Sequence, residues 1–425
     1  MGRRIVVTGL GPVTPIGIGK DAYWDALAGG KSGVKRVDNR IDLDGIDVRI
    51  GAPVDTFDPL LFMDRKTAHR TDRATQFALA ATQLALADAG LEPGALDPER
   101  TGVVVGTGIG GLETMEQNFT ALFQGGPRKV SPLFIPRLMP NAIAGQISIE
   151  HNLRGPNFGV VSACASAAHA LGVAADLIRT GQLDCAVAGG SEAVLLRIAY
   201  AGFSQLGALS RRNDDPARAS RPFDRDRDGF VMGEGAGIVI LESEDHAQAR
   251  GARVYGELAG FGMTADAEHI TAPAADGRGA AQAMIQAMTQ AGVDRKDVHY
   301  INAHGTSTQL NDKAETVAIK LAFGEHAWKL KVSSTKSQIG HLLGAAGGVE
   351  AIATLLSMEK GLIPATLNYE HRDPACDLDY TPHAVRVEIT TALSNSFGFG
   401  GQNAALLFRS ARRPRAPSQD SAGQS

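Results

Sequence analysis

The sequence predicts an α/β fold built from two similar halves. Apolar runs typical of strands alternate with runs typical of helices along the 425 residues, a pattern that places helices against largely parallel sheets. In each half a turn of small residues leads into an Ala- and Gly-rich helix, which ends at Gly181 in the first half and at Gly361 in the second. The 50 glycines favour tight turns and close packing of these elements.

The elements follow in order along the two halves. In the first we expect a strand over 4–11, an amphipathic helix over 73–90 closed by Gly90, a strand over 101–108, a helix over 165–180, and strands over 183–194 and 235–243. In the second we expect a strand over 254–265, a helix over 277–293, a strand and loop over 298–308, a helix over 341–361 and a last strand over 403–410. The predicted units are therefore 1–253 and 254–412, followed by a polar tail over 413–425 that is predicted to be disordered.

Composition excludes several classes of protein. No apolar run approaches the roughly 20 residues of a membrane helix, and the N-terminus lacks the apolar core of a signal peptide, so no membrane association is expected. The three cysteines, Cys164, Cys185 and Cys376, are scattered without a CxxC pair, which favours a reducing cytoplasm over a disulfide framework or a zinc site. The net charge of −4 and the lack of aromatic residues between basic clusters argue against nucleic acid.

Two short motifs match known signatures without their context. GTGIGG over 106–111 fits a dinucleotide-binding loop, but no helix with an acidic strand end follows about 20 residues later. DRDRDG over 224–229 resembles the start of a calcium loop, but Gly235 stands at the twelfth position, where the bidentate Glu belongs. We therefore expect neither dinucleotide nor calcium binding.

One cysteine and two histidines carry the chemistry. A lone Cys in an Ala-rich run is usually a small core residue. Cys164, however, directly precedes a predicted helix, whose N-terminus would stabilise a thiolate. His304 and His341 follow apolar segments and are flanked by Gly, Ser and Thr, at the kind of position where α/β proteins bind ligands. This set indicates nucleophilic catalysis by a thiol.

These residues lie in blocks by which the chain resembles the β-ketoacyl-acyl carrier protein synthases of the thiolase superfamily, and most closely the synthase II type of bacterial fatty acid synthesis. The resemblance runs from residue 3 to about 410 and rests on SACASAAHA, PFDRDRDGFVMGEGAG, NAHGTSTQLNDKAE, SSTKSQIGHLLGAAG and NSFGFGGQNA. It implies the thiolase-like, five-layered α-β-α-β-α fold of two pseudo-duplicated halves, and a homodimer.

The resemblance also implies a reaction, the decarboxylative Claisen condensation of a malonyl group with an acyl group, which lengthens the acyl chain by two carbons. Cys164 matches the nucleophile, and His304 and His341 match the pair that binds the malonyl thioester carbonyl. Lys336 matches a lysine that orients the histidine loop, and Glu350 is expected to pair with it. The backbone N–H groups of Cys164 and Phe399 match the oxyanion hole. No cofactor is required, because the phosphopantetheine arrives on the carrier protein.

Further positions are assigned by the same resemblance. Phe399 matches a gate, Ile109 and Phe203 the acyl channel, and Thr306 and Thr308 the hydroxyls that hold the phosphopantetheine arm. Gln402 departs from the Thr or His of many relatives. A monovalent cation, K⁺ or Na⁺, is held in some relatives at the positions of Asn302, Glu350, Ser394 and Asn395. The docking patch for the acidic acyl carrier protein matches Arg65, Lys66, Arg70, Arg128 and Lys129.

Four alternatives remain at this point. A ketosynthase of a polyketide or aryl polyene pathway shares the catalytic residues. A non-condensing chain-length factor is disfavoured by Cys164. A thiolase would need a second cysteine as base, and neither Cys185 nor Cys376 lies in a suitable loop block. An acyl-binding scaffold is disfavoured by the complete set of Cys164, two histidines and Lys336.

Overall fold

The computed structural model describes residues 2–92 and 94–411, so the predicted tail over 413–425 lies outside the described residues. Strands of the first half follow one another in the sheet as β1, β8, β7, β5, β6, and those of the second half as β9, β15, β14, β10, β11. The bounds are Ile5–Thr14 for β1, Thr101–Gly106 for β5, Asn157–Val160 for β6, Cys185–Glu192 for β7 and Gly235–Ser243 for β8; then Gly256–Ala265 for β9, Tyr300–Asn302 for β10, Lys331–Ser333 for β11, Thr391–Gly398 for β14 and Gln402–Ser410 for β15.

The strand order shows the duplication directly. In each half the first strand lies beside the fifth, followed by the fourth, the second and the third. The two sets meet where β1 pairs with β9 at Val6–Glu257 and Val7–Gly256. The chain crosses between the halves through α9 (Glu244–Ala249). Two similar halves are therefore confirmed, while the boundary at 253/254 stays a prediction.

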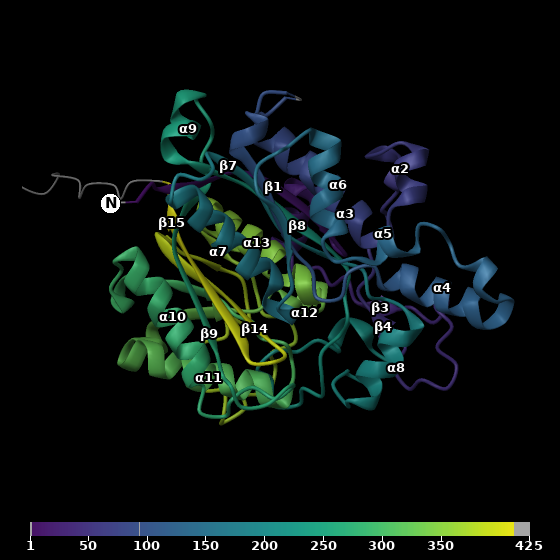
Figure 1. Cartoon of the computed structure of the whole chain (residues 1–425). Coiled ribbons are helices and arrows are strands. Elements are labelled where there is room, and N and C mark those ends of the chain that lie inside the picture. Colours follow the sequence, from purple (N-terminus) through teal and green to yellow (C-terminus); the bar gives the residue numbers. More distant parts are fainter. Residues whose placement is uncertain (1, 93, 412–425) are drawn as a thin grey trace, which may run out of the picture.

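Helices cover both sets of strands and separate them (Figure 1). The middle layer contains α7 (Ser166–Arg179) and α13 (Ala346–Lys360), which pack against strands of both halves. The outer layers are α3 (Arg73–Asp88) with α6 (Ala142–His151), and α10 (Arg278–Ala291) with α11 (Gln309–Phe323). This gives the expected five layers.

The Ala- and Gly-rich composition of the middle helices follows from this position. Nearly every residue of α13 is buried, because strands lie on both of its sides. A Cβ on Gly172 of α7 would lie 2.3 Å from the ring of Phe261, and one on Gly237 of β8 would lie 2.3 Å from the backbone N of Val349. Larger side chains would force the layers apart.

Two sequence-based expectations are wrong in detail. The sheets are mixed rather than largely parallel: β5–β6, β5–β7, β10–β11 and β10–β14 are parallel, but the pairs formed by β1, β8, β9 and β15 are antiparallel. The three-residue link from β14 to β15 permits only an antiparallel pair. The last helix also starts at Ala346 rather than at His341, because Leu343 adopts a left-handed φ of 45° in the turn before it.

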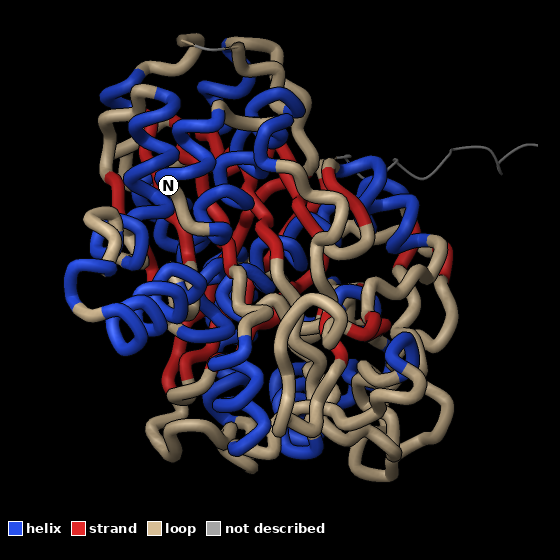
Figure 2. Tube along the Cα trace, turned by 90° about the vertical axis from the view of Figure 1, so that its right-hand side faces the viewer, coloured by secondary structure: helices blue, strands red, loops and turns tan. Residues whose placement is uncertain are grey.

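Smaller elements surround this core. They are α1 (Lys20–Ala28), α2 (Arg65–Arg70), α4 (Leu112–Gly125), α5 (Phe134–Leu138), α8 (Arg197–Gln205) and α12 (Lys336–Ile339), with short strands β2 (Gly17–Ile18), β3 (Lys35–Arg36), β4 (Ile50–Gly51), β12 (Leu362–Ile363) and β13 (Val385–Arg386). Long loops gather toward the lower right of Figure 2. Among the described helices, none has the length and apolar character needed to cross a membrane.

Candidate active site

Cys164 lies in a tight turn at the start of a middle helix. The turn η4 (Ala163–Ala165) runs directly into α7, and Ala163 has a left-handed φ of 49°. Ser166 fixes this conformation, since its Oγ accepts from the N–H of Ser162 at 2.9 Å and donates to the carbonyl of Ala163 at 2.7 Å. A strained residue held by such contacts is typical of functional sites.

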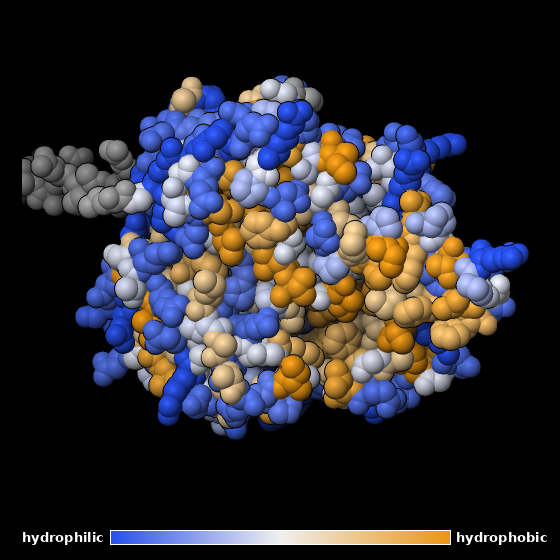
Figure 3. Space-filling model, viewed as in Figure 1, coloured by the Kyte–Doolittle hydropathy of each residue, from blue (hydrophilic) through white to orange (hydrophobic). Residues whose placement is uncertain are grey.

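A cavity of about 440 Å³ opens over this turn. Its lining brings together eight of the residues singled out in the sequence: Cys164, Ile109, Phe203, His304, Thr306, Thr308, His341 and Phe399. Figure 3 shows the surface hollowed between the ends of β14 and α8, with apolar side chains gathered around the hollow. An apolar cavity with a few converging polar groups suits an acyl chain that ends at a reacting thioester.

The two histidines face the thiol. The Cys164 Sγ and one ring nitrogen of each histidine lie within 4.8 Å of one another, and the rings of His304 and His341 are 5.3 Å apart at 84°. The Nδ1 of His341 accepts the N–H of Leu343 at 3.2 Å, which assigns the ring proton to Nε2. That Nε2 has no partner among the described residues. Burial lowers the pKa of both histidines well below the ordinary value, so both are neutral N–H donors.

Lys336 does not line the cavity; it contacts His304, which does. It is buried at the start of α12, and its Nζ lies 3.3 Å from the Nδ1 of His304. An ammonium only donates, so His304 also carries its proton on Nε2. The same Nζ forms the expected ion pair with Glu350, which is buried on α13. Lys336 is therefore a positioning residue that fixes the tautomer of His304.

Phe399 places a second amide beside the thiol. It follows β14 at the turn whose Gly400 and Gly401 have φ of 86° and 69°, and its N–H donates to the Cys164 thiol. A Cβ on Gly398 would lie 3.2 Å from the Cys164 N, so the backbone after β14 approaches the backbone of the Cys164 turn closely. The amides of Cys164 and Phe399 thus lie together, as the oxyanion-hole assignment requires.

Burial dominates the chemistry of the thiol. It raises the pKa of Cys164 to about 11, although the charge of Lys336 and the amide of Phe399 act in the opposite direction. The stabilised thiolate expected from a helix start is therefore outweighed by desolvation. At neutral pH the resting group is a thiol.

We predict that alkylation of Cys164 by iodoacetamide accelerates steadily with pH. The thiolate is the nucleophile, so its fraction should rise about tenfold per pH unit up to a midpoint near the pKa of about 11. The rate would be followed by mass spectrometry of the peptide that carries Cys164. A plateau already reached at pH 8 would show instead that the resting enzyme holds a thiolate.

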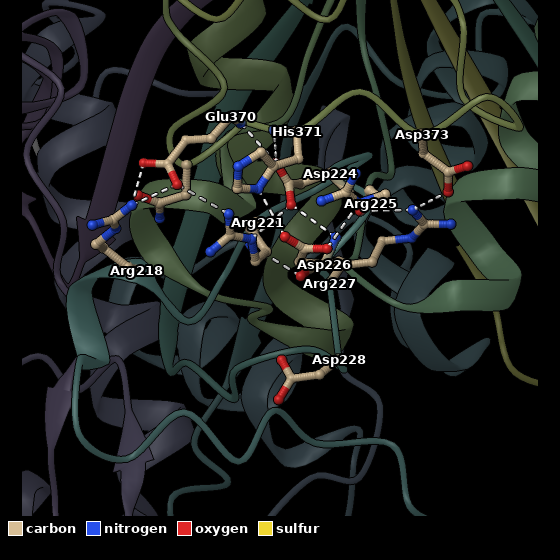
Figure 4. Close-up of polar contacts among 12 residues, drawn as sticks. Arg218, Arg221, Asp224, Arg225, Asp226, Arg227, Asp228, Glu370, His371 and Asp373 are labelled. Carbon is tan, nitrogen blue, oxygen red and sulfur yellow. Dashed lines mark hydrogen bonds and ion pairs between the residues drawn. The ribbon is translucent and has the colours of Figure 1, made fainter.

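The DRDRDG segment forms a network of polar contacts with Arg221 and with the segment 370–373 (Figure 4). The Asp224 carboxylate accepts from Arg221 Nε and from the backbone N–H groups of Asp226, Glu370 and His371, at 2.6–2.9 Å. Arg227 donates to the carbonyl of Thr308 at 3.0 Å and to Asp373 at 2.7 Å. Asp224, the first residue of this segment, therefore accepts from protein donors, and Arg227 links the segment to the end of the loop from 304 to 308.

Sequence reasoning missed two buried carboxylates. Glu315 accepts the N–H groups of His304 at 2.9 Å and Gly305 at 2.8 Å, and burial raises its pKa to about 7. Glu192 plays a similar part in the first half, where it accepts from Gly108. Glu192 is the last residue of β7 and lies near the end of the apolar run LDCAVAGGSEAV. An acidic residue at the end of a buried strand was the available signal.

The four positions assigned to a cation offer a fitting donor set. The side-chain oxygens Asn302 Oδ1, Glu350 Oε2, Ser394 Oγ and Asn395 Oδ1 are buried and have no hydrogen-bond partner among the described residues. Asn302 and Ser394 are partners in the β10–β14 register. Buried oxygens of this kind need a partner, and one carboxylate with three neutral oxygens suits a hard cation of low charge.

The remaining residues singled out in the sequence are the five basic positions assigned to carrier docking and Gln402. Arg65, Lys66 and Arg70 lie on α2, and Arg128 and Lys129 lie in the turn Pro127–Lys129 that follows α4; all five are exposed, and within the described part of the chain none forms an ion pair. Gln402 begins β15, and its Oε1 is buried without a hydrogen-bond partner there.

Comparison with known proteins shows the family. Models of the N-terminal and C-terminal domains of beta-ketoacyl synthases match residues 2–247 and 255–370. The 3-oxoacyl-[acyl-carrier-protein] synthase 2 of Synechocystis sp. is 49% identical over 408 residues, covering 96% of this chain and 98% of that protein. The protein of the same name from Coxiella burnetii is 46% identical over 406 residues, covering 95% of this chain and 98% of that protein.

Solved structures agree. A beta-ketoacyl synthase from Burkholderia phymatum superimposes with a TM-score of 0.90 at 37% identity, covering 96% of this chain and all of that one (100%). A ketosynthase in complex with its type II polyketide acyl-carrier protein gives 0.90 at 35% identity, with coverages of 96% and 100%. The fold implied by the sequence motifs is thereby confirmed, and the chain belongs to the beta-ketoacyl synthase family.

Proposed function

We propose that this chain is a condensing enzyme of the 3-oxoacyl-[acyl-carrier-protein] synthase II type. One observation carries the proposal: the Cys164 thiol and two neutral imidazoles lie within 4.8 Å of one another on the wall of an apolar cavity. Relatives that are 46–49% identical over nearly the whole chain bear this name. The polyketide ketosynthases found by structure are 35% identical, which favours fatty acyl elongation over the polyketide alternative.

The first half-reaction loads the thiol. The sulfur of Cys164 attacks the carbonyl of an acyl thioester, and the N–H groups of Cys164 and Phe399 donate to the oxygen as it gains charge. The carbon–sulfur bond to the carrier then breaks, and the thiol proton passes to the departing thiolate. Because one thiol replaces another, a thiol with a pKa of about 11 needs no permanent base. Ile109 and Phe203 line the cavity that receives the chain.

The second half-reaction uses the histidines. Their Nε2–H groups donate to the malonyl thioester carbonyl, and the electron pair of the breaking bond to CO₂ is held as an enolate. The enolate carbon attacks the Cys164 thioester, the carbon–sulfur bond breaks, and the thiolate takes a proton from water. Neutral donors suit this step because they stabilise the enolate without protonating it. Burial, which keeps both histidines neutral, is thus part of the mechanism.

Asn302, Glu350, Ser394 and Asn395 would hold a K⁺ or Na⁺ ion, which would supply positive charge beside the Lys336–Glu350 pair. No other cofactor is proposed. Thr306 and Thr308, whose hydroxyls lie 3.0 Å apart in the cavity lining, would bind the phosphopantetheine arm.

The proposed macromolecular partners are an acyl carrier protein and a second copy of the chain. Five exposed basic side chains, three on α2 and two in the turn that follows α4, support docking of an acidic carrier. Dimerisation is supported by β6, an edge strand of the described sheet that carries the exposed Phe158 and is followed by the exposed Val161, while Ile149 is exposed on α6. The three free cysteines favour the cytoplasm.

Product analysis tests the function. The protein would be mixed with malonyl-carrier and a ladder of acyl-carrier primers, and the products weighed by mass spectrometry. We expect a β-ketoacyl-carrier two carbons longer than its primer. A protein that is acylated on Cys164 without forming this product would need another extender, and one that is never acylated would not be a condensing enzyme.

We predict that reversing the charges of Arg65 and Lys66 to Glu raises the KM for acyl-carrier about tenfold and leaves kcat almost unchanged. The two residues are exposed and do not line the cavity that holds the reacting groups, so only carrier affinity and its salt dependence should change. Lys296→Glu, at an exposed site in the turn Arg295–Asp297, is the matched control and should keep the wild-type KM. Identical salt dependence in the reversed variant and the wild type would rule out docking at α2.

A further inference from the structure

Glu192 is a fully buried carboxylate that the proposed mechanism does not use. It ends β7, and two loops converge on it. Its Oε1 accepts from Thr107 Oγ1 at 2.9 Å and from the N–H of Ile109 at 3.3 Å. Its Oε2 accepts from the N–H of Gly108 at 2.6 Å and from the N–H of Gly344 at 3.0 Å. Three of the four partners are backbone N–H groups, which can only donate, and the Thr107 hydroxyl, which accepts the N–H of Gly110 at 3.1 Å, turns its own proton toward Glu192. Burial raises the pKa of the Glu192 carboxyl, and these four hydrogen bonds act in the opposite direction by stabilising the carboxylate.

The duplication explains why donors converge here. Cys164 lies in η4 before α7, and Gly344 lies in η8 (Leu343–Ala345) before α13, the corresponding helix. The preceding residues, Ala163 and Leu343, share the same unusual backbone, with φ of 49° and 45°. Gly344 is therefore the counterpart of Cys164. The N–H of Cys164 belongs to the proposed oxyanion hole, whereas the N–H of Gly344 already donates to Glu192.

We propose that the Glu192 carboxylate permanently fills the second half's counterpart of the oxyanion hole, and that this makes Glu192 a positioning residue for the acyl-cavity wall and the His341 loop. The space is built for it. A Cβ on either Gly108 or Gly344 would lie 2.7 Å from Oε2, so only glycine allows both amides to reach the carboxylate. The N–H of Cys164 thus stays free to bind the oxygen that gains charge in the reaction, whereas its counterpart, the N–H of Gly344, is occupied by the Glu192 carboxylate.

Both loops held by Glu192 lead to reacting groups. On one side, Gly108 and Ile109 line the cavity, and a Cβ on Gly108 would lie 3.7 Å from the carbonyl of Ala163, next to the nucleophile. On the other side, Gly344 follows Leu343, whose N–H donates to the Nδ1 of His341 and so fixes its tautomer. Glu192 is therefore positioned to couple the acyl side of the cavity to the malonyl side. The catalytic consequences rest on the proposed function.

The test compares Glu192→Gln and Glu192→Ala with the wild type. In Glu192→Gln the side chain offers one acceptor oxygen and places an NH₂ group against N–H donors, so the two loops should move. Because the acyl-cavity wall and the His341 loop would then be misplaced, we expect kcat for condensation to fall about 10- to 100-fold. The KM for acyl-carrier should rise. Besides burial, the charge of Glu192 contributes to the high pKa of Cys164, so alkylation of Cys164 should shift to lower pH in Glu192→Gln. Ala leaves the four donors facing an empty site, and added formate should partly restore its activity, while equal chloride should not.

The controls separate the possible failures. Glu242→Gln removes another fully buried carboxylate, on β8 and away from the cavity lining, and should change stability without changing the Cys164 alkylation profile. A folded Glu192→Gln with wild-type kcat, KM and alkylation profile would overturn the inference, as would an impaired Glu192→Ala that formate does not restore. If the wild type itself forms no product, the proposed function fails, and a shifted alkylation profile would still support the placement of Glu192. If neither variant folds, Thr107→Val removes one donor at equal size; a severalfold fall in kcat would support the inference, and wild-type kinetics would overturn it.

Discussion

Replacing Cys164 by alanine is expected to abolish condensation, with a loss on the order of 10⁴-fold or more, because no other group can form the acyl-enzyme. The substitution removes one sulfur from a site beside a cavity, and the backbone N–H of residue 164 remains in the oxyanion hole. Stability should therefore change little. Intact-protein mass spectrometry after mixing with acyl-carrier would show the acyl adduct in the wild type and none in the variant.

The other cysteines supply the control. Cys376 is fully buried in the core of the second half, and it lies outside the cavity lining. Cys376→Ala should retain the acyl adduct and condensation, at a modest cost in stability. An acyl adduct that survives in Cys164→Ala but disappears in Cys376→Ala would show that Cys376 is the nucleophile. That result would overturn the mechanism.

The sequence predicted the reacting groups better than their surroundings. Cys164, His304 and His341 lie in short blocks whose Gly and Ser residues mark turns at the ends of elements, and turns are determined locally. Ile109, which the resemblance assigned to the acyl channel, lines the same cavity as Cys164 although the two residues are far apart in the chain. Lys336 was placed near the histidines, but the sequence could not show that it stands behind His304 with its charge compensated by Glu350.

The features that sequence reasoning missed depend on contacts between distant segments. The pKa of Cys164 is set by how completely strands and loops of both halves cover the turn, which outweighs the local effect of a helix start. The accepting roles of Glu192 and Glu315 depend on loops from other parts of the chain. The start of α13 was misplaced because Leu343 adopts a left-handed conformation to direct the chain past Glu192, against its local preference.

Replacing Lys336 by methionine should impair both catalysis and stability. The Glu350 carboxylate would remain fully buried without its partner, and breaking a buried ion pair from one side costs about 3–5 kcal/mol. The Nδ1 of His304 would lose its donor, so the ring could move its proton away from Nε2. Loss of one such donor typically lowers kcat about 10²- to 10³-fold. Acylation of Cys164, which uses the amides instead, should persist.

A double variant separates these two effects. In Lys336→Met/Glu350→Gln the uncompensated charge is gone, so the midpoint of urea unfolding should recover, but His304 still lacks its donor and condensation should stay low. Lys331→Met, which breaks a half-exposed ion pair with Asp379, is the matched control; it should cost at most about 1 kcal/mol and leave kcat unchanged. If condensation recovers together with stability in the double variant, Lys336 serves only to neutralise Glu350. If stability recovers alone, the lysine acts through the tautomer of His304, and the buried ion pair is what keeps its ammonium in place to do so.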